Sequence, residues 1–251
     1  MQKSLFPPIP DKSSPFDRDF LLRPREPGIS RLDKIPIREC GEPLVLLKGL
    51  SPRLRVKAPL PWARAAVARR LVEVAESLPE RLLLLVHTSL RSHTMQEKAY
   101  WNYFKMMGER HPNWPPSVLR REVNRFLHPP DYKAPPGHCT GGAVDVGIIY
   151  SNGRRIDMMS SEPPEQKTWG TFYRQLTPPA RANRALLYNA MIKAGFTNCY
   201  DEWWHYSYGD SAWAVRSGNE SAIYGLPPEI PPELGQLIQR VQKKIPRRPR
   251  I

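Results

Sequence analysis

Prolines restrict the fold of this chain more than any other residue type. The 251-residue sequence holds 29 of them, about twice the average share. Many stand in adjacent pairs, such as Pro115-Pro116 and Pro227-Pro228. Because proline fixes φ and removes a backbone donor, each pair interrupts a helix or an interior strand. The chain is therefore predicted to build short elements joined by stiff connections, without long helices or a repeat array.

The apolar residues are numerous enough for one packed core. Hydrophobic residues make up 40% of the chain and include 7 Trp, 10 Tyr and 7 Phe. A chain of this length can form one large domain, and its composition shows no internal boundary. We therefore predict a Pro/Arg-rich N-terminal extension that packs on the domain (1–39), the domain itself (40–225) and a Pro-rich, basic C-terminal tail (226–251).

Local patterns predict helices mixed with hairpin-like strands. Residues 62–78 place apolar side chains on one stripe at helical spacing, and residues 82–86 are an apolar run typical of a buried strand. This order favours an α+β fold: a single domain with a largely antiparallel sheet flanked by helices, with extended Pro/Arg-rich ends. Further helices are predicted at about 95–108, 117–127 and 179–194. Further strands are predicted at 142–150, in a hairpin partner RRIDMM, and at 196–200, 202–206 and 212–216.

The formal charge is +14, and part of it is concentrated in RVQKKIPRRPRI at residues 240–251. A charge block of this kind is typical of a solvated tail, and the sequence contains no nucleic-acid-binding motif. We therefore expect no specific nucleic-acid partner.

No apolar stretch approaches the ~20 residues of a membrane span, and the N-terminus lacks a signal-peptide core. The predicted location is the cytoplasm, and the sequence does not identify protein partners.

Residues that can bind a metal stand in two places. Three cysteines without a CxxC pair argue against a thiolate site. His138 lies in PPGHCTGGAVDVG and His205 in YDEWWHY, and with Asp145 they would supply two imidazoles and one carboxylate. Catalytic zinc sites use three such N and O donors and leave a fourth position for water. The Gly141-Gly142 pair allows a sharp turn, so that His138 and Asp145 can converge.

Glu202 is the acidic residue three positions before His205. In a regular strand, two side chains three positions apart face opposite sides of the sheet. A shared site requires a bend or the end of a strand between them. The spacing by itself leaves this open.

The two segments together resemble the zinc D,D-peptidase family, in particular the D-alanyl-D-alanine dipeptidases associated with vancomycin resistance. That family carries His-x-x-Gly-x-Ala-x-Asp and, later, Glu-x-x-His within a Glu-Trp-Trp-His block. The resemblance covers roughly residues 40–216. The two motifs occur in the same order and with the same internal spacings, at His138, Gly141, Ala143, Asp145 and Glu202-Trp203-Trp204-His205. An arginine-bearing segment, Asp-x-Tyr-Arg-Pro in the family, resembles Thr88-Ser89-Leu90-Arg91-Ser92, which keeps the arginine alone. Pro136 stands where the family often has serine.

The resemblance implies a zinc dipeptidase. One Zn²⁺ per chain would be held by His138, Asp145 and His205. Glu202 would be the general acid/base, and Arg91 would stabilise the oxyanion. The implied substrate is free D-Ala-D-Ala in a small closed pocket that rejects longer peptides. The alternatives are a cell-wall D,D-carboxypeptidase, a dipeptidase of other specificity, or a non-catalytic zinc-containing binding protein.

Overall fold

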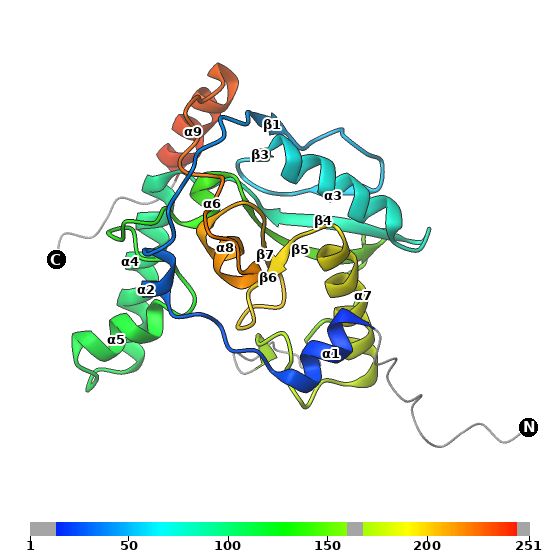
Figure 1. Ribbon diagram of the computed structural model, residues 1–251, viewed down its shortest axis with the longest axis horizontal. Helices are drawn as coiled ribbons and strands as arrows, with labels where there is room; N and C mark the ends of the chain where they lie inside the picture. The colour runs from blue at the N-terminus through cyan, green and yellow to red at the C-terminus, as the bar shows by residue number, and fades with distance from the viewer. Residues whose placement is uncertain (1–13, 160–167, 245–251) are drawn as a thin grey trace, which may run out of the picture.

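A five-stranded sheet forms the centre of the computed structural model, which describes residues 14–159 and 168–244 (Figure 1). Its strand order is β2-β4-β5-β7-β6. Only the pair β2 and β4 is parallel, and the other neighbours are antiparallel. The predicted α+β fold with a largely antiparallel sheet is therefore confirmed. The strands are β2 (Leu54–Val56), β4 (Leu82–Thr88), β5 (Ala143–Tyr150), β6 (Thr197–Asn198) and β7 (His205–Ser207).

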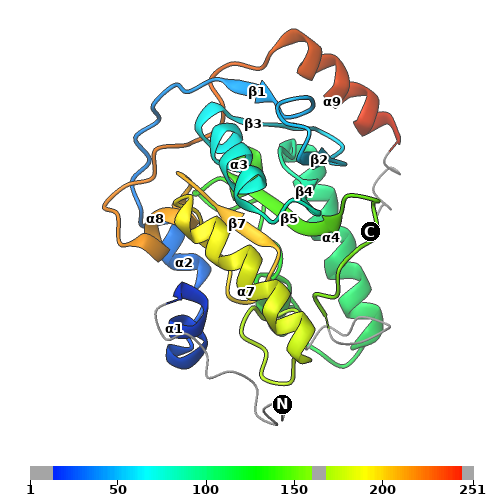
Figure 2. The same ribbon diagram turned by 90° about the vertical axis from the view of Figure 1, so that its right-hand side faces the viewer.

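The two faces of β5 have different partners. Val144, Val146 and Ile148 belong to the main core, together with residues of α3 (Ala65–Ser77) and α7 (Pro178–Lys193). These two helices cover one face of the sheet (Figure 2). Because successive side chains of a strand point to opposite faces, Asp145 lies on the other face. The alternation therefore places the candidate metal ligand away from the main core.

The predicted helices are confirmed within a few residues of their expected ends. Ser92 caps α4 (His93–Arg110) by accepting from the backbone N–H of Met95, and Thr177 caps α7 by accepting from Ala180. α5 (Pro116–Val123) starts with proline in its first turn, where the missing donor costs nothing. In the described part of the chain, no helix is both long and apolar enough to cross a membrane.

The N-terminal segment packs on α7. In α1 (Pro15–Leu22), Phe16 is fully buried, and its ring contacts those of Phe172 and Tyr188. The Tyr188 hydroxyl donates to Asp19 over 2.6 Å. α2 (Ile29–Leu32) follows and contacts α8 (Ser211–Ser217). Residues 15–32 are thus part of the folded unit, and they include the segment that borders the site described below.

Two strand predictions were wrong. Residues 212–216 belong to a helix, α8 (Ser211–Ser217), because Asp210 accepts from the backbone N–H of Trp213 as its N-cap and Gly218 ends it in a left-handed conformation. RRIDMM forms no second hairpin strand, since only Arg155 bridges to Ile149. Its later residues turn into the core, where the buried Arg184 guanidinium donates to the Met158 carbonyl over 2.7 Å.

Residues 232–244 form α9 (Pro232–Lys244) in place of the extended tail that the sequence predicted. Leu234, Leu237, Ile238 and Val241 recur at helical spacing and pack on Leu90, Leu44 and Leu60. α9 lies beside β1 (Leu44–Leu46), which pairs with β3 (Trp62–Arg64) (Figure 1). The many prolines and arginines of residues 226–251 favoured the prediction of an extended tail, so the apolar residues at helical spacing were not recognised. Residues 245–251 of the predicted tail lie outside the described residues.

Leu234→Ala is expected to destabilise the fold by about 2–5 kcal/mol, because this side chain is fully buried and its truncation leaves a cavity. Leu226→Ala is the matched control, since Leu226 is 53% exposed, and a change within about 0.5 kcal/mol is expected. Denaturant unfolding of both variants measures the difference. Equal stability of the two variants would show that α9 is not docked.

Candidate metal centre

The end of β4 and the short helix α6 (Gly137–Thr140) position His138. Its Nδ1 lies 2.9 Å from the Ser89 carbonyl, and its own carbonyl accepts from the Arg91 backbone N–H over 3.0 Å. A ring whose Nδ1 donates to a carbonyl presents Nε2 as the free donor atom for a metal. Gly141 ends α6 at φ 75°, where a Cβ would lie 2.7 Å from a methyl of Leu44. The glycine is therefore required for the chain to turn from α6 into β5.

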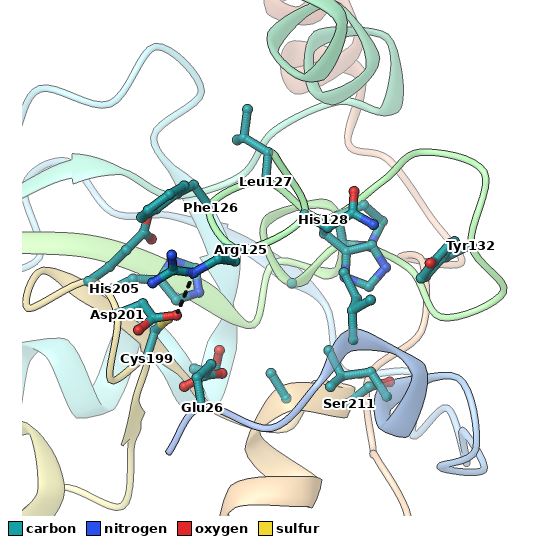
Figure 3. Close-up of a pocket in the computed structure, with 18 of the residues that line it drawn as sticks. Glu26, Arg125, Phe126, Leu127, His128, Tyr132, Cys199, Asp201, His205 and Ser211 are labelled. Atoms are coloured by element: carbon teal, nitrogen blue, oxygen red, sulfur yellow. Dashed lines mark ion pairs between the residues drawn. The ribbon is translucent and has the colours of Figure 1, made fainter. Parts of the chain in front are cut away.

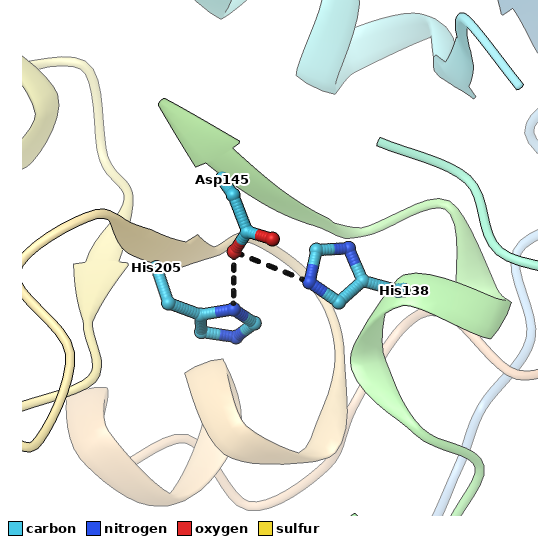
Figure 4. Close-up of side chains that lie close together, drawn as sticks. All are labelled: His138, Asp145 and His205. Atoms are coloured by element: carbon cyan, nitrogen blue, oxygen red, sulfur yellow. Dashed lines mark hydrogen bonds and ion pairs between the residues drawn. The ribbon is translucent and has the colours of Figure 1, made fainter. Parts of the chain in front are cut away.

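Asp145 and His205 are a directly opposed pair on β5 and β7. Opposed residues on neighbouring strands project to the same face, so the two side chains meet. Asp145 Oδ1 lies 3.0 Å from His205 Nδ1 and 3.3 Å from His138 Nε2 (Figure 4). The two imidazole rings are 4.9 Å apart and nearly perpendicular.

The three side chains fit a small metal ion. One ligand atom of each of His138, Asp145 and His205 lies within 4.8 Å of the others. Ligand atoms bound at 2.0–2.1 Å to a tetrahedral zinc are separated by roughly 3.3 Å, close to the two measured distances. The donors are two nitrogens and one carboxylate oxygen, a set that zinc favours in catalytic sites.

The charge states also suit a cation. Burial alone would raise the pKa of Asp145, but the charges and hydrogen bonds of His138 and His205 hold it well below its usual range. Burial lowers the pKa of His138, so this ring is neutral near pH 7. Burial likewise acts to lower the pKa of His205, but its hydrogen bond to Asp145 raises it. A bound metal would replace that proton, because metal ligands must be deprotonated.

Glu202 reaches the same site because a turn precedes β7. The His205 backbone N–H donates to the Glu202 carbonyl over 3.1 Å, and β7 begins only at His205. The strand predicted at 202–206 therefore begins later than expected, at His205. A turn lies between Glu202 and His205, as a shared site requires. Burial raises the pKa of Glu202 to about 8, while His205 and Arg91 oppose the shift. A nearby metal dication would favour the ionised form, which suits a proton-transferring group near neutrality.

Arg91 borders the cavity beside His138. Its backbone is tied to the His138 carbonyl, and its Nη1 donates to Gln96 Oε1 over 2.8 Å. Its positive charge adds to the effect of burial in lowering the pKa of His138, and it opposes the larger effect of burial that raises the pKa of Glu202. The structure therefore brings together all five residues that the sequence selected, which are His138, Asp145, His205, Glu202 and Arg91.

Other residues near these motifs have structural roles. Cys139 is buried, and burial raises the pKa of its thiol to about 12, so it is not a nucleophile at neutral pH. It does not belong to the group of ligand atoms formed by His138, Asp145 and His205. Trp203 packs against the main core, and Trp204 borders the cavity. Asp157 accepts from Met159 on an exposed loop. The Ser89 carbonyl, rather than an acid, orients His138.

The cavity has a volume of about 860 Å³ and is larger than the small closed pocket that the sequence analysis expected. His205 and Asp201 lie toward one end, and His128 and Tyr132 toward the other (Figure 3). The N-terminal segment borders it through Glu26, whose carboxylate accepts from the buried Arg216 over 2.6 Å. The sequence contained no local signal for this pair, since 190 positions separate its members.

Fold and site together define a metal-dependent hydrolase, with three side chains that can hold a metal and a half-buried carboxyl group beside them. Residues 79–221, more than half of the chain, match the family described as D-ala-D-ala dipeptidase, and the chain belongs to that family. It is also 26% identical over 216 residues to a D-alanyl-D-alanine dipeptidase of Synechocystis sp., covering 72% of this chain and 87% of that protein. The predicted class, a zinc-dependent hydrolase of the D-Ala-D-Ala dipeptidase family, is confirmed.

Solved structures of D,D-peptidases are more distantly similar. A mutant of the vancomycin resistance D,D-pentapeptidase VanY from a VanB-type cassette, in complex with Zn(II), is 11% identical with a TM-score of 0.41, covering 76% of this chain and 96% of that chain. VanYB in complex with D-alanine-D-alanine is 12% identical with a TM-score of 0.39, covering 73% and 84%. At this similarity, no residue role is transferred from either structure.

Proposed function

We propose that this chain hydrolyses D-Ala-D-Ala at a single zinc ion held by His138, Asp145 and His205. The observation that supports this most directly is the convergence of these side chains with Glu202 and Arg91 around one cavity. The name of the Synechocystis relative supports the dipeptide as substrate.

Each residue has a distinct part in the proposed reaction. A zinc ion bound here would lower the pKa of a coordinated water and polarise the scissile carbonyl. Glu202 accepts the proton of the attacking water and passes it to the leaving amine. Arg91 donates to the oxygen that becomes negative in the transition state. The Ser89 carbonyl fixes the His138 ring in the orientation that ligation needs.

The direct test is release of D-Ala from D-Ala-D-Ala by the purified protein. We expect turnover that a chelator abolishes and added zinc restores. If the zinc-loaded protein releases no D-Ala, the proposed function is wrong. This result would favour the alternative of a non-catalytic zinc-containing protein, which the intact Glu202 argues against.

A D,D-carboxypeptidase remains the second candidate, and the cavity volume favours it. A cavity of about 860 Å³ lies in the upper range of sites for drug-sized ligands, so a longer peptide can be accommodated. Comparing kcat/KM on D-Ala-D-Ala and on a muropeptide ending in D-Ala-D-Ala separates the two candidates. Higher kcat/KM on the muropeptide would assign the carboxypeptidase.

Arg91→Lys is expected to lower kcat/KM by about 10²-fold, since losing one oxyanion donor has an effect of this order. A lysine ammonium lacks the planar fork of arginine and cannot both hold Gln96 and direct a second donor at the carbonyl. Zinc content should not change. Arg125→Lys is the control, because Arg125 borders the same cavity and pairs with Asp201. Equal activity of the two variants would return Arg91 to a structural role.

The cytoplasm remains our proposal for the location of the protein. All three cysteines are free, and two of them, Cys139 and Cys199, are buried. Free thiols without disulfides are typical of reducing compartments. Fractionation of cells that produce the protein tests this.

A further inference from the structure

Gln96 is a buried polar residue that the sequence analysis did not single out. It lies in the first turn of α4, its side chain is in contact with the site, and the residue is only 2% exposed. A buried amide is costly unless both its ends are paired. Here the oxygen accepts from Arg91 Nη1 over 2.8 Å, and the nitrogen donates to the His128 carbonyl over 2.8 Å.

These two hydrogen bonds connect Arg91 to His128, another residue that lines the cavity. His128 follows α5 and is 32 positions from Gln96 in the sequence. The backbone of Gln96 is fixed at the N-terminal end of α4, because its N–H donates to the Ser92 carbonyl over 3.0 Å. The Arg91 backbone N–H in turn donates to the carbonyl of His138. The Arg91 backbone is therefore held by His138, and its guanidinium is held by Gln96.

The partner of Arg91 is neutral, and this matters for its charge. Within residues 14–159 and 168–244, no ion pair includes Arg91. A carboxylate in the place of Gln96 would offset the positive charge that an oxyanion donor needs. An amide oxygen orients the guanidinium and leaves its charge available.

We propose that Gln96 is a positioning residue for Arg91, which aims the guanidinium at the reacting carbonyl without neutralising it. The proposal rests on the function proposed above, because it assigns to Gln96 an effect that acts through Arg91. Gln96 itself does not touch the reacting atoms.

The test compares Gln96→Met and Gln96→Glu in the zinc-loaded full chain. Methionine has a similar length and removes both hydrogen bonds. We expect kcat to fall about tenfold or more, the effect of losing a hydrogen bond to a charged group, with KM and zinc content unchanged. Glutamate retains an acceptor for Arg91 but adds a negative charge. The kcat of Gln96→Glu should therefore also be lower than that of the wild type. Wild-type kcat in both variants would overturn the proposal.

Gln242→Met is the matched control. Gln242 belongs to α9, and its amide donates to Ser92 Oγ over 3.1 Å, next to Arg91 but not to its guanidinium. The same substitution there should leave kcat unchanged. An equal loss of kcat in the Gln242 and Gln96 variants would show a general packing effect and would contradict the proposal.

Two further measurements separate this proposal from the proposed function. Adding Gln96→Met to Arg91→Lys should cause no further loss of kcat if Gln96 acts through Arg91, whereas independent effects would multiply.

Nitrogen NMR of the arginine side chains needs no turnover. Rotation of the Arg91 guanidinium should be slow in the wild type and fast in Gln96→Met. If the wild type shows this restriction but hydrolyses no dipeptide, the positioning contact stands and the proposed function fails. Free rotation in the wild type would overturn the positioning role itself.

Discussion

Glu202→Gln is expected to retain zinc and the fold while kcat falls by about 10²–10⁴-fold, the usual range for loss of general acid–base assistance. The amide has nearly the same shape as the carboxyl group but cannot accept the proton of the attacking water. Glu202 lies in the turn before β7, and its own backbone contacts hold that turn, so the exchange of one oxygen for nitrogen should leave the turn intact.

Zinc content and kcat measured on the same preparation distinguish three roles for Glu202. Retained zinc with a large loss of kcat supports the acid/base. Retained zinc with full activity would refute the proposed mechanism. Lost zinc would make Glu202 a ligand. Asp201→Asn is the neighbouring control, since Asp201 also borders the cavity but pairs with Arg125, and its activity should stay near that of the wild type.

The second large effect is expected from the metal ligands. His138→Ala, Asp145→Ala and His205→Ala should each lower zinc occupancy and reduce D-Ala release to the level of the chelated protein. A site with two remaining donors loses both affinity and the tetrahedral arrangement. Asp145→Ala should have the most severe effect, because its carboxylate contacts both imidazoles.

Elemental analysis of protein purified without added metal measures this occupancy. His111→Ala is the control, since His111 stacks on Trp114 at the end of α4 and is not one of the grouped ligands. We expect about one zinc per chain in the wild type and in this control. Full occupancy in all three ligand variants would refute the assignment of the metal site.

Local sequence patterns were sufficient for the elements that carry their own signal. The apolar stripe at 65–77 predicts α3, and the apolar run from residue 82 predicts β4. The stripe is a periodicity over a few helical turns, and the run is a short continuous apolar segment. Both can be recognised in the sequence without knowledge of the fold. α8 was missed because its seven residues satisfy more than one pattern, and the N-cap contact of Asp210 favours the helix. α9 was missed because prolines and arginines surround its apolar residues, which become buried only by packing on Leu90 and its neighbours.

The sequence by itself determined the family and selected the five candidate site residues, because their types and spacings stand in two short motifs and one arginine-bearing segment. Only the tertiary structure decided that Glu202 and His205 share a site, since a turn between them replaces the strand that their spacing suggested. It also decided the cavity lining and the orientation of the Gln96 amide that Arg91 contacts. The lining includes Glu26, and the His128 carbonyl holds the Gln96 amide; both groups are remote in the chain, and only packing brings them to the site.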